Sequence, residues 1–90
     1  MDLVELTAAR ARELGFADAG GALISVVRPL SAAERKGVFA DTRIVAINRQ
    51  PIGSAAQAEG LLRGLRSGEI ASLLLESADG RTRIANVRVP

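Results

Sequence analysis

Residues able to do covalent or metal chemistry are scarce in this chain of 90 residues, which contains no histidine and no cysteine. A Ser-His-Asp arrangement therefore cannot be assembled from it, and the soft ligands that zinc favours are missing. The stretch Ser77–Thr82 carries a single aspartate and does not match a calcium-binding loop. Gly20 and Gly21 are too isolated to form a phosphate-cradling loop. The sequence thus predicts no catalytic residue, no metal site and no cofactor within the chain.

Charged residues are the other feature of the chain that could determine a binding partner. It holds 12 basic and 10 acidic residues, a net charge of +2. The basic residues form no run and have no interleaved aromatic residues on which bases could stack. A nucleic-acid-binding surface would need Arg63, Arg66, Arg81 and Arg83 to converge on one face. We therefore expect no nucleic-acid partner, and salt-dependent binding of an oligonucleotide is the observation that would contradict this expectation.

The composition predicts one domain with an aliphatic core. Apolar residues make up 48% of the chain, with two phenylalanines and no tryptophan or tyrosine. A chain of this length forms a single domain with a modest core. No apolar run approaches the roughly 20 residues of a membrane-spanning helix, and Asp2 and Glu5 do not suit a signal peptide. We expect residues 1–90 to be one soluble domain, cut from a longer protein.

The first third of the chain reads as strand, helix and strand. The spacing of Leu3 and Leu6 predicts a short strand with one covered face. Thr7 is placed to cap a helix over residues 8–14, and Gly15 is placed to end it in the left-handed conformation. The apolar, β-branched stretch Ala22–Val27 predicts a buried strand.

The middle of the chain combines short elements with tight turns. Ser31 and Glu34 form a capping box for a helix of about one turn, which Gly37 would end. A strand is expected over residues 43–48. The turn at Asn48 and Arg49 lacks glycine, although asparagine tolerates a positive φ. Because Pro51 cannot donate to a ladder, residues 50–52 predict only a stub at an edge.

The last part predicts a longer helix and a hairpin. Ser54 and Gln57 form a second capping box, opening a helix over residues 55–66 that Gly68 would close. Strands over residues 71–77 and 82–89 would be joined across the Asp79-Gly80 turn signal. Ile84 and Val87 fall out of phase in the last strand, which indicates a bulge or an edge. Together the elements predict a small α+β domain with a partly closed antiparallel sheet.

The stretch ISVVRPLSAAERKGVFADTRIVAINRQPI, residues 24–52, resembles the signature of PDZ domains. It departs from that pattern at Asp41 and Arg49, where the pattern has glycine, and at Thr42, where it has aspartate. These departures concern the turns more than the fold. Residues 4–27 resemble more specifically the PDZ domains of bacterial HtrA/Deg serine proteases. Over the whole chain the resemblance implies a PDZ-like, partly open five-stranded antiparallel β-barrel or sandwich flanked by two to three helices.

The resemblance also implies a site. In a PDZ domain an extended peptide adds a strand in a groove between a strand edge and a helix. A loop just before the groove strand catches the terminal carboxylate, and here that loop would precede Met1. An aliphatic residue at strand or helix spacing is more often a core residue than a ligand contact, so Leu3 and Leu62 also fit the core, and Glu59 also fits a solvated position on the helix. A small residue at position 55 predicts an apolar, weakly selective pocket. The peptide-binding residues expected from the resemblance are Met1, Asp2, Leu3, Val4, Ala55, Glu59 and Leu62.

Two functions follow from the resemblance. In the first, the domain recruits substrate to, or regulates, an HtrA/Deg-like protease of the bacterial periplasm or cell envelope. It would bind C-terminal or exposed hydrophobic segments of unfolded proteins, and a protease domain of the same parent chain would hold the catalytic residues. In the alternative, the domain packs on the protease core or holds an oligomer together, and its groove is vestigial.

Overall fold

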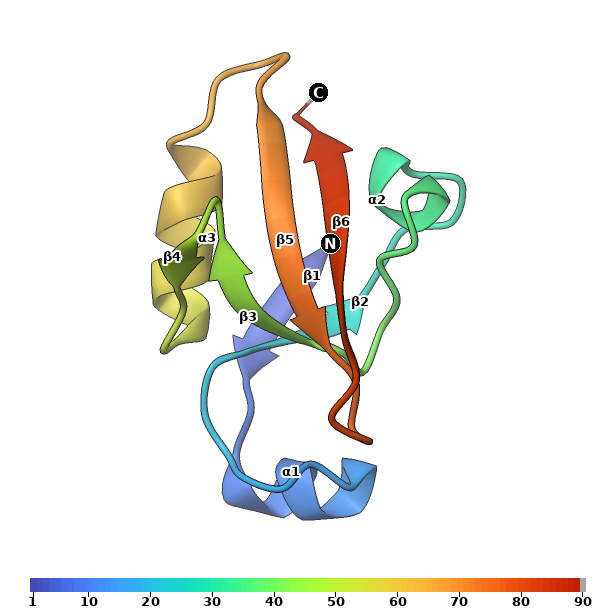
Figure 1. The fold of residues 1–90 in the computed structure, drawn as a ribbon, viewed down its shortest axis with the longest axis vertical. Coiled ribbons are helices and arrows are strands. Elements are labelled where there is room, and N and C mark those ends of the chain that lie inside the picture. The colour runs from blue at the N-terminus through green and yellow to red at the C-terminus, as the bar shows by residue number, and fades with distance from the viewer. Residues whose placement is uncertain (90) are drawn as a thin grey trace.

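A six-stranded antiparallel sheet organises residues 1–89, the part of the chain that the computed structural model describes (Figure 1). The strand order is β1-β2-β3-β5-β6, and β4 pairs with β3. Three helices flank the sheet, so the α+β class is confirmed. In chain order the elements are β1 (Asp2–Glu5), α1 (Ala8–Leu14), β2 (Ala22–Val26), α2 (Ala32–Arg35), β3 (Arg43–Ile47), β4 (Gln50–Pro51), α3 (Ala55–Arg63), β5 (Ile70–Glu76) and β6 (Thr82–Arg88).

The sheet is open rather than closed into a barrel. β1 pairs only with β2, and β6 pairs only with β5, so each leaves one backbone edge without a neighbouring strand. The five strands expected from the sequence are all present, and the expected stub forms the two-residue β4 as a sixth. In Figure 1, α3 lies on one side of the sheet, α2 lies beside β6, and α1 lies at one end.

The predicted helix caps are confirmed. Each helix begins after a hydroxyl residue whose oxygen accepts a backbone hydrogen bond from the first turn, which satisfies a donor that the helix itself cannot. Thr7 accepts from the N–H of Arg10 at 3.2 Å, and Ser54 accepts from that of Gln57 at 3.1 Å. Ser31 does the same for α2. Gly15 ends α1 with a φ of 93°, the left-handed conformation expected there.

The predicted end of the long helix is wrong. The α3 helix ends at Arg63 rather than at Arg66, and Gly64 is its C-terminal cap. The N–H of Leu65 donates to the carbonyl of Leu62, three residues back, so the helical turn tightens and stops there. Gly68 instead forms the turn into β5, with a φ of 89°. Leu65 continues the apolar spacing of the helix after its backbone has left it, which explains the overestimate.

Two further predictions concern turns and strand phase. Asn48 and Arg49 have φ angles of 49° and 69°, the pair of positive values that a type I′ hairpin turn requires. The side-chain oxygen of Asn48 also accepts from the N–H of Ser72 at 2.8 Å. β6 pairs with β5 without a register shift, so the predicted bulge is absent from it and the alternative, an edge strand, is confirmed.

The apolar interior has two parts. The larger cluster joins β2, β3, β5, β6 and α3, with Ile24, Ile44 and Leu73 fully buried. A smaller cluster under α1 contains Leu6, Ala11, Phe16 and Leu23.

Arg43 links the loop after α1 to the sheet. Its guanidinium lies 5.1 Å from the centre of the Phe16 ring, pairs with Asp18 at 2.8 Å and also pairs with Glu76. Burial lowers the pKa of Arg43, but hydrogen bonds and charge interactions with Glu76 and Asp18 outweigh it, so the pKa is raised. The side chain is therefore a permanent cation held between the two parts of the structure.

Candidate functional site

The first feature of the site is the free edge of β1. The N–H of Leu6 donates to the carbonyl of Gly21 at 3.3 Å, and the carbonyl of Asp2 accepts from the hydroxyl of Ser25 at 3.1 Å, so both backbone groups point towards the β2 side. Backbone groups alternate in direction along a strand. The N–H and C=O groups of Leu3 and Glu5 therefore point to the open edge, where another extended chain could pair with them.

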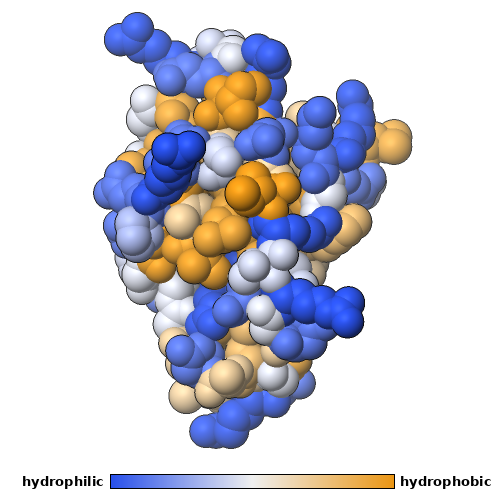
Figure 2. All heavy atoms as spheres, viewed as in Figure 1, coloured by the Kyte–Doolittle hydropathy of each residue, from blue (hydrophilic) through white to orange (hydrophobic). Residues whose placement is uncertain are grey.

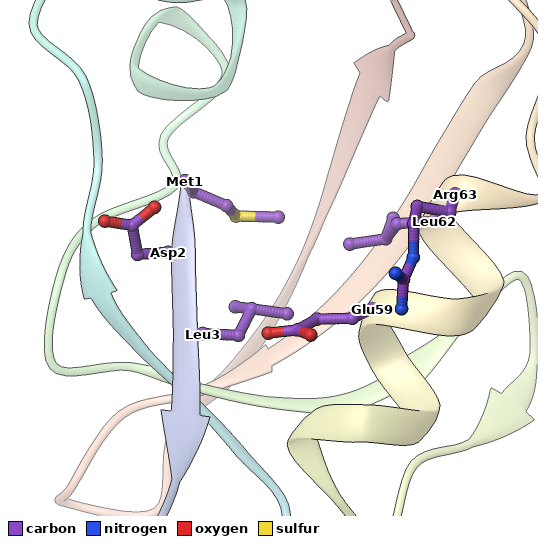
Figure 3. Close-up of a pocket in the computed structure, with 6 residues that line it drawn as sticks. All are labelled: Met1, Asp2, Leu3, Glu59, Leu62 and Arg63. Atoms are coloured by element: carbon purple, nitrogen blue, oxygen red, sulfur yellow. The ribbon is translucent and has the colours of Figure 1, made fainter.

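A cavity of about 500 Å³ lies between this strand and α3 (Figure 3). Met1 and Leu3 point from the strand towards Leu62 and Glu59 on the helix, and Asp2 points away from them. Apolar side chains of both walls thus face each other across the groove, together with the carboxylate of Glu59, and Asp2 and Arg63 add charge to its lining. The lining residues are Met1, Asp2, Leu3, Glu59, Leu62 and Arg63.

Glu5 connects the two walls of the groove at the end where β1 finishes and α3 begins. Its carboxylate accepts a hydrogen bond of 2.6 Å from the N–H of Ala55, the first residue of α3. A negative charge is favourable at this position, because the N-terminus of a helix carries unpaired N–H groups and a partial positive charge. Glu5 therefore ties the start of α3 to β1 and sets the separation of the two walls.

The structure brings together five of the seven residues expected at the site. Met1, Asp2, Leu3, Glu59 and Leu62 line the cavity. The other two do not: Val4 is exposed and does not line the cavity, and Ala55 is buried in the larger core. The pocket predicted from the small residue at position 55 is therefore not part of this cavity.

Sequence reasoning missed two residues of the site, Glu5 and Arg63. Both carried a signal in their spacing. Arg63 follows Glu59 by four residues, which places the two side chains on one face of α3. Glu5 follows Leu3 by two residues, which places it on the groove side of β1.

A second apolar cavity, of about 350 Å³, adjoins the first. The two share Met1 and Leu62 as lining residues. The second cavity is bounded by Leu73 and Val87 of the sheet and by the start of α2. Arg28 and Arg88 also line it. A peptide side chain that passes Met1 would therefore meet an apolar space with two arginines at its border.

The arginines expected for a nucleic-acid surface do not converge. Arg66 precedes β5, whereas Arg81 lies beyond the opposite end of that seven-residue strand, a separation of roughly 20 Å along the strand direction. Arg63 lines the groove, and Arg83 donates to the carbonyl of Gly37. Arg63 and Arg66 therefore lie apart from Arg81 and Arg83, and the four do not share one face.

Residues 1–89 hold no group of three or more acidic residues placed to bind a metal ion. None of the helices in this part of the chain is long and apolar enough to cross a bilayer. No family model matches the chain, and no curated protein matches it.

Proposed function

We propose that this chain is a peptide-binding domain of the PDZ type, in which an extended polypeptide adds a strand to the open edge of β1. The observation that carries the proposal is the position of that edge. It faces α3 across a cavity to which both walls contribute apolar side chains, and the backbone groups of Leu3 and Glu5 point to the open edge. Strand addition uses this combination: backbone hydrogen bonds supply affinity, and pockets for alternate side chains supply selectivity.

The lining of the groove suggests which peptides it accepts. Met1, Leu3 and Leu62 offer apolar contacts to one set of alternate side chains, and the second cavity beyond Met1 extends that apolar surface. A peptide with apolar residues near its end suits this lining better than a uniformly polar one, because apolar burial is the main favourable term available. The charged residues of the lining are Asp2, Glu59 and Arg63, two acidic groups and one basic group.

Within a larger protein we propose the role implied by the resemblance to HtrA/Deg proteases. The domain would recruit substrates to the protease, or regulate it, by binding C-terminal or exposed hydrophobic segments of unfolded proteins in the bacterial periplasm or envelope. Catalysis would belong to another domain, because a chain without histidine cannot form a Ser-His-Asp triad. The apolar lining of the groove supports this role, since unfolded proteins differ in sequence but share exposed apolar segments.

The test of strand addition is calorimetric titration with an apolar peptide and with versions that are N-methylated at alternate residues. Methylating the set of peptide N–H groups that faces β1 removes the ladder bonds and should abolish binding, whereas methylating the other set should leave the affinity within about twofold. Free acids and C-terminal amides of the same peptide show whether a terminal carboxylate adds affinity. If no peptide binds, the alternative of a structural domain with a vestigial groove replaces the proposal.

A pair of variants on α3 locates the binding to the groove. Leu62→Glu places a charge among the apolar lining residues and should weaken peptide binding by about tenfold or more. Ala56→Glu adds the same charge at an exposed position of the same helix that does not line the cavity, and it should leave binding unchanged. Equal losses in the two variants would show that the peptide is held elsewhere.

A further inference from the structure

Positive charge is concentrated on one side of the domain. Residues 28–36 and 81–88 contain six of the 12 basic residues and a single acidic residue, Glu34. The remainder of the chain contains the other six basic residues and nine acidic ones. The small net charge of +2 is therefore the sum of a strongly basic region and a weakly acidic remainder. We call the first region the basic edge: Arg28, Arg35, Lys36, Arg81, Arg83 and Arg88.

The structure brings these two segments together along β6. Arg28 and Arg88 line one cavity, which places the chain just before α2 beside the end of β6. At the other end of α2, the guanidinium of Arg83 donates to the carbonyl of Gly37. The helix thus lies beside the strand, as Figure 1 shows, and the charges of both belong to one surface.

The charges of the basic edge are largely unneutralised. Among residues 1–89, Arg81 is the only member in an ion pair, with Asp79 at 3.5 Å. Arg35 and Arg88 donate to the carbonyls of Leu30 and Gly68, which orients them but leaves their positive charge in place. Fields from like charges add, so a surface of this kind attracts anionic groups at low salt.

The same surface carries an open backbone edge and exposed apolar side chains. β6 is seven residues long, contains no proline and pairs with β5 without a register shift. Its other edge has no partner strand among the described residues. Ile84 is 65% exposed and Phe39, beneath the guanidinium of Arg83, is 53% exposed. Figure 2 shows hydrophobic atoms among hydrophilic ones on the face that contains β5 and β6.

We propose that the basic edge binds an extended acidic polypeptide segment, in which acidic and apolar side chains alternate and whose backbone pairs with β6. Arg83 and the basic residues beside α2 would contact the acidic side chains on one face of β6, and Ile84 the apolar ones on the other face. This inference does not depend on the function proposed for the β1–α3 groove.

A second copy of the chain and a nucleic acid fit the basic edge less well than an acidic polypeptide does. A second copy of the chain, paired through its own β6, would bring Arg83 and Arg88 of both copies to one seam, where like charges repel. A nucleic acid would use the arginines, but it has no N–H and C=O ladder to match the strand edge and no use for Ile84.

The test uses a synthetic peptide of about seven residues that alternates glutamate with valine, blocked at both ends so that it carries no terminal charge. Its binding to the whole chain is measured by fluorescence anisotropy at low and at high salt, beside a matched peptide of lysine and valine and a single-stranded oligonucleotide. We expect the glutamate peptide to bind, to weaken as salt rises, and to bind more tightly than either comparison ligand.

Charge-neutralising variants locate the site. The triple variant Arg28→Gln, Arg35→Gln and Lys36→Gln should weaken glutamate-peptide binding by about tenfold. Arg10→Gln, Arg12→Gln and Arg66→Gln remove the same net charge outside the basic edge and should change it less than about threefold. Leu3→Asp, a groove substitution outside the cavity that Arg28 and Arg88 line, should leave it unchanged, which separates this site from the groove. Equal losses in the two triple variants would overturn the assignment.

Two further comparisons test strand pairing and the class of ligand. Peptides N-methylated at alternate residues should differ in affinity, depending on whether the methylated groups face β6. Equal affinity of the two versions would overturn pairing with the strand. Tighter binding of the oligonucleotide than of the glutamate peptide would overturn the acidic-segment proposal in favour of a nucleic-acid surface. Tighter binding of the lysine peptide would show that the positive charge of the basic edge does not select the ligand, and it would overturn the proposal.

Discussion

The two open edges of the sheet offer the same backbone groups in different surroundings. The edge of β1 is four residues long and faces α3 across an apolar cavity with one acidic and one basic side chain on the helix. The edge of β6 is seven residues long and lies beside α2 among basic side chains of which, in residues 1–89, only Arg81 is in an ion pair. An unpaired strand edge attracts any extended chain, and charged residues are a common means of limiting that attraction. The side chains around an edge, rather than the edge itself, thus decide what it accepts.

The largest expected effect comes from the core that supports both edges. Leu73 is fully buried in β5, between β3 and β6, and lines the second cavity. Leu73→Ala should lower the free energy of unfolding by about 2 to 5 kcal/mol, because it removes buried methyl groups and leaves a cavity. Urea unfolding followed by circular dichroism measures the change. A loss below about 1 kcal/mol would mean that Leu73 is not tightly packed in this core.

A substitution on β1 should separate the two edges. Leu3→Asp puts a charge on the groove side of the strand and should weaken binding of an apolar peptide by about tenfold or more. The glutamate peptide at β6 should bind as before. Val4→Asp changes the exposed residue next to it, which does not line the cavity, and is the matched control. If Leu3→Asp weakens both ligands equally, the edges are not independent.

A smaller effect is expected from the contact that sets the width of the groove. Glu5→Ala removes the carboxylate that accepts from the N–H of Ala55, and it should lower the free energy of unfolding by about 1 kcal/mol, as the loss of a helix cap does. Peptide affinity at β1 should fall by a few-fold, and affinity at β6 should not change. Thermal unfolding and calorimetry measure the two quantities. Glu13→Ala, which alters an exposed ion pair on α1, is the control for loss of a carboxylate.

The smallest effect on stability is expected from a substitution at Arg49, in the turn between β3 and β4, and it should not change binding at either edge. Arg49 has a positive φ of 69°, which is strained for a residue with a side chain. Arg49→Gly relieves that strain but makes the unfolded chain more flexible, so the expected gain in stability is only about 0.5 kcal/mol. A change in either peptide affinity would show that the β3–β4 hairpin communicates with the edges.

Local signals in the sequence were sufficient for most of the fold. Thr7, Ser31 and Ser54 each begin a helix as expected, because capping depends on residues within three positions. The end of α3 was placed too late, because the spacing of Leu65 reflects packing on the core and not helical backbone. The phase of β6 was ambiguous until its pairing with β5 showed that Ala85 faces the core and Ile84 faces solvent.

The candidate site was harder to predict from the sequence than the fold was. Five of its residues were expected from the resemblance, but Ala55 could not be assigned to the core without knowing how α3 is rotated on the sheet. The contact between Glu5 and Ala55 joins residues 50 positions apart, and the spacing of either residue alone does not reveal it. The basic edge likewise forms only when α2 is placed beside β6, so arginines that are scattered along the sequence gather in space.

The attachment of α1 has a consequence for how the molecule opens. The helix packs on a small cluster of its own, and the loop that follows it is fastened to the sheet by Arg43 through Asp18, Glu76 and Phe16. Segments with few buried contacts unfold locally at a lower free energy than the whole domain. Residues 8–20 should therefore exchange their amide hydrogens with solvent before the central strands do, and a protease should first cut the chain there.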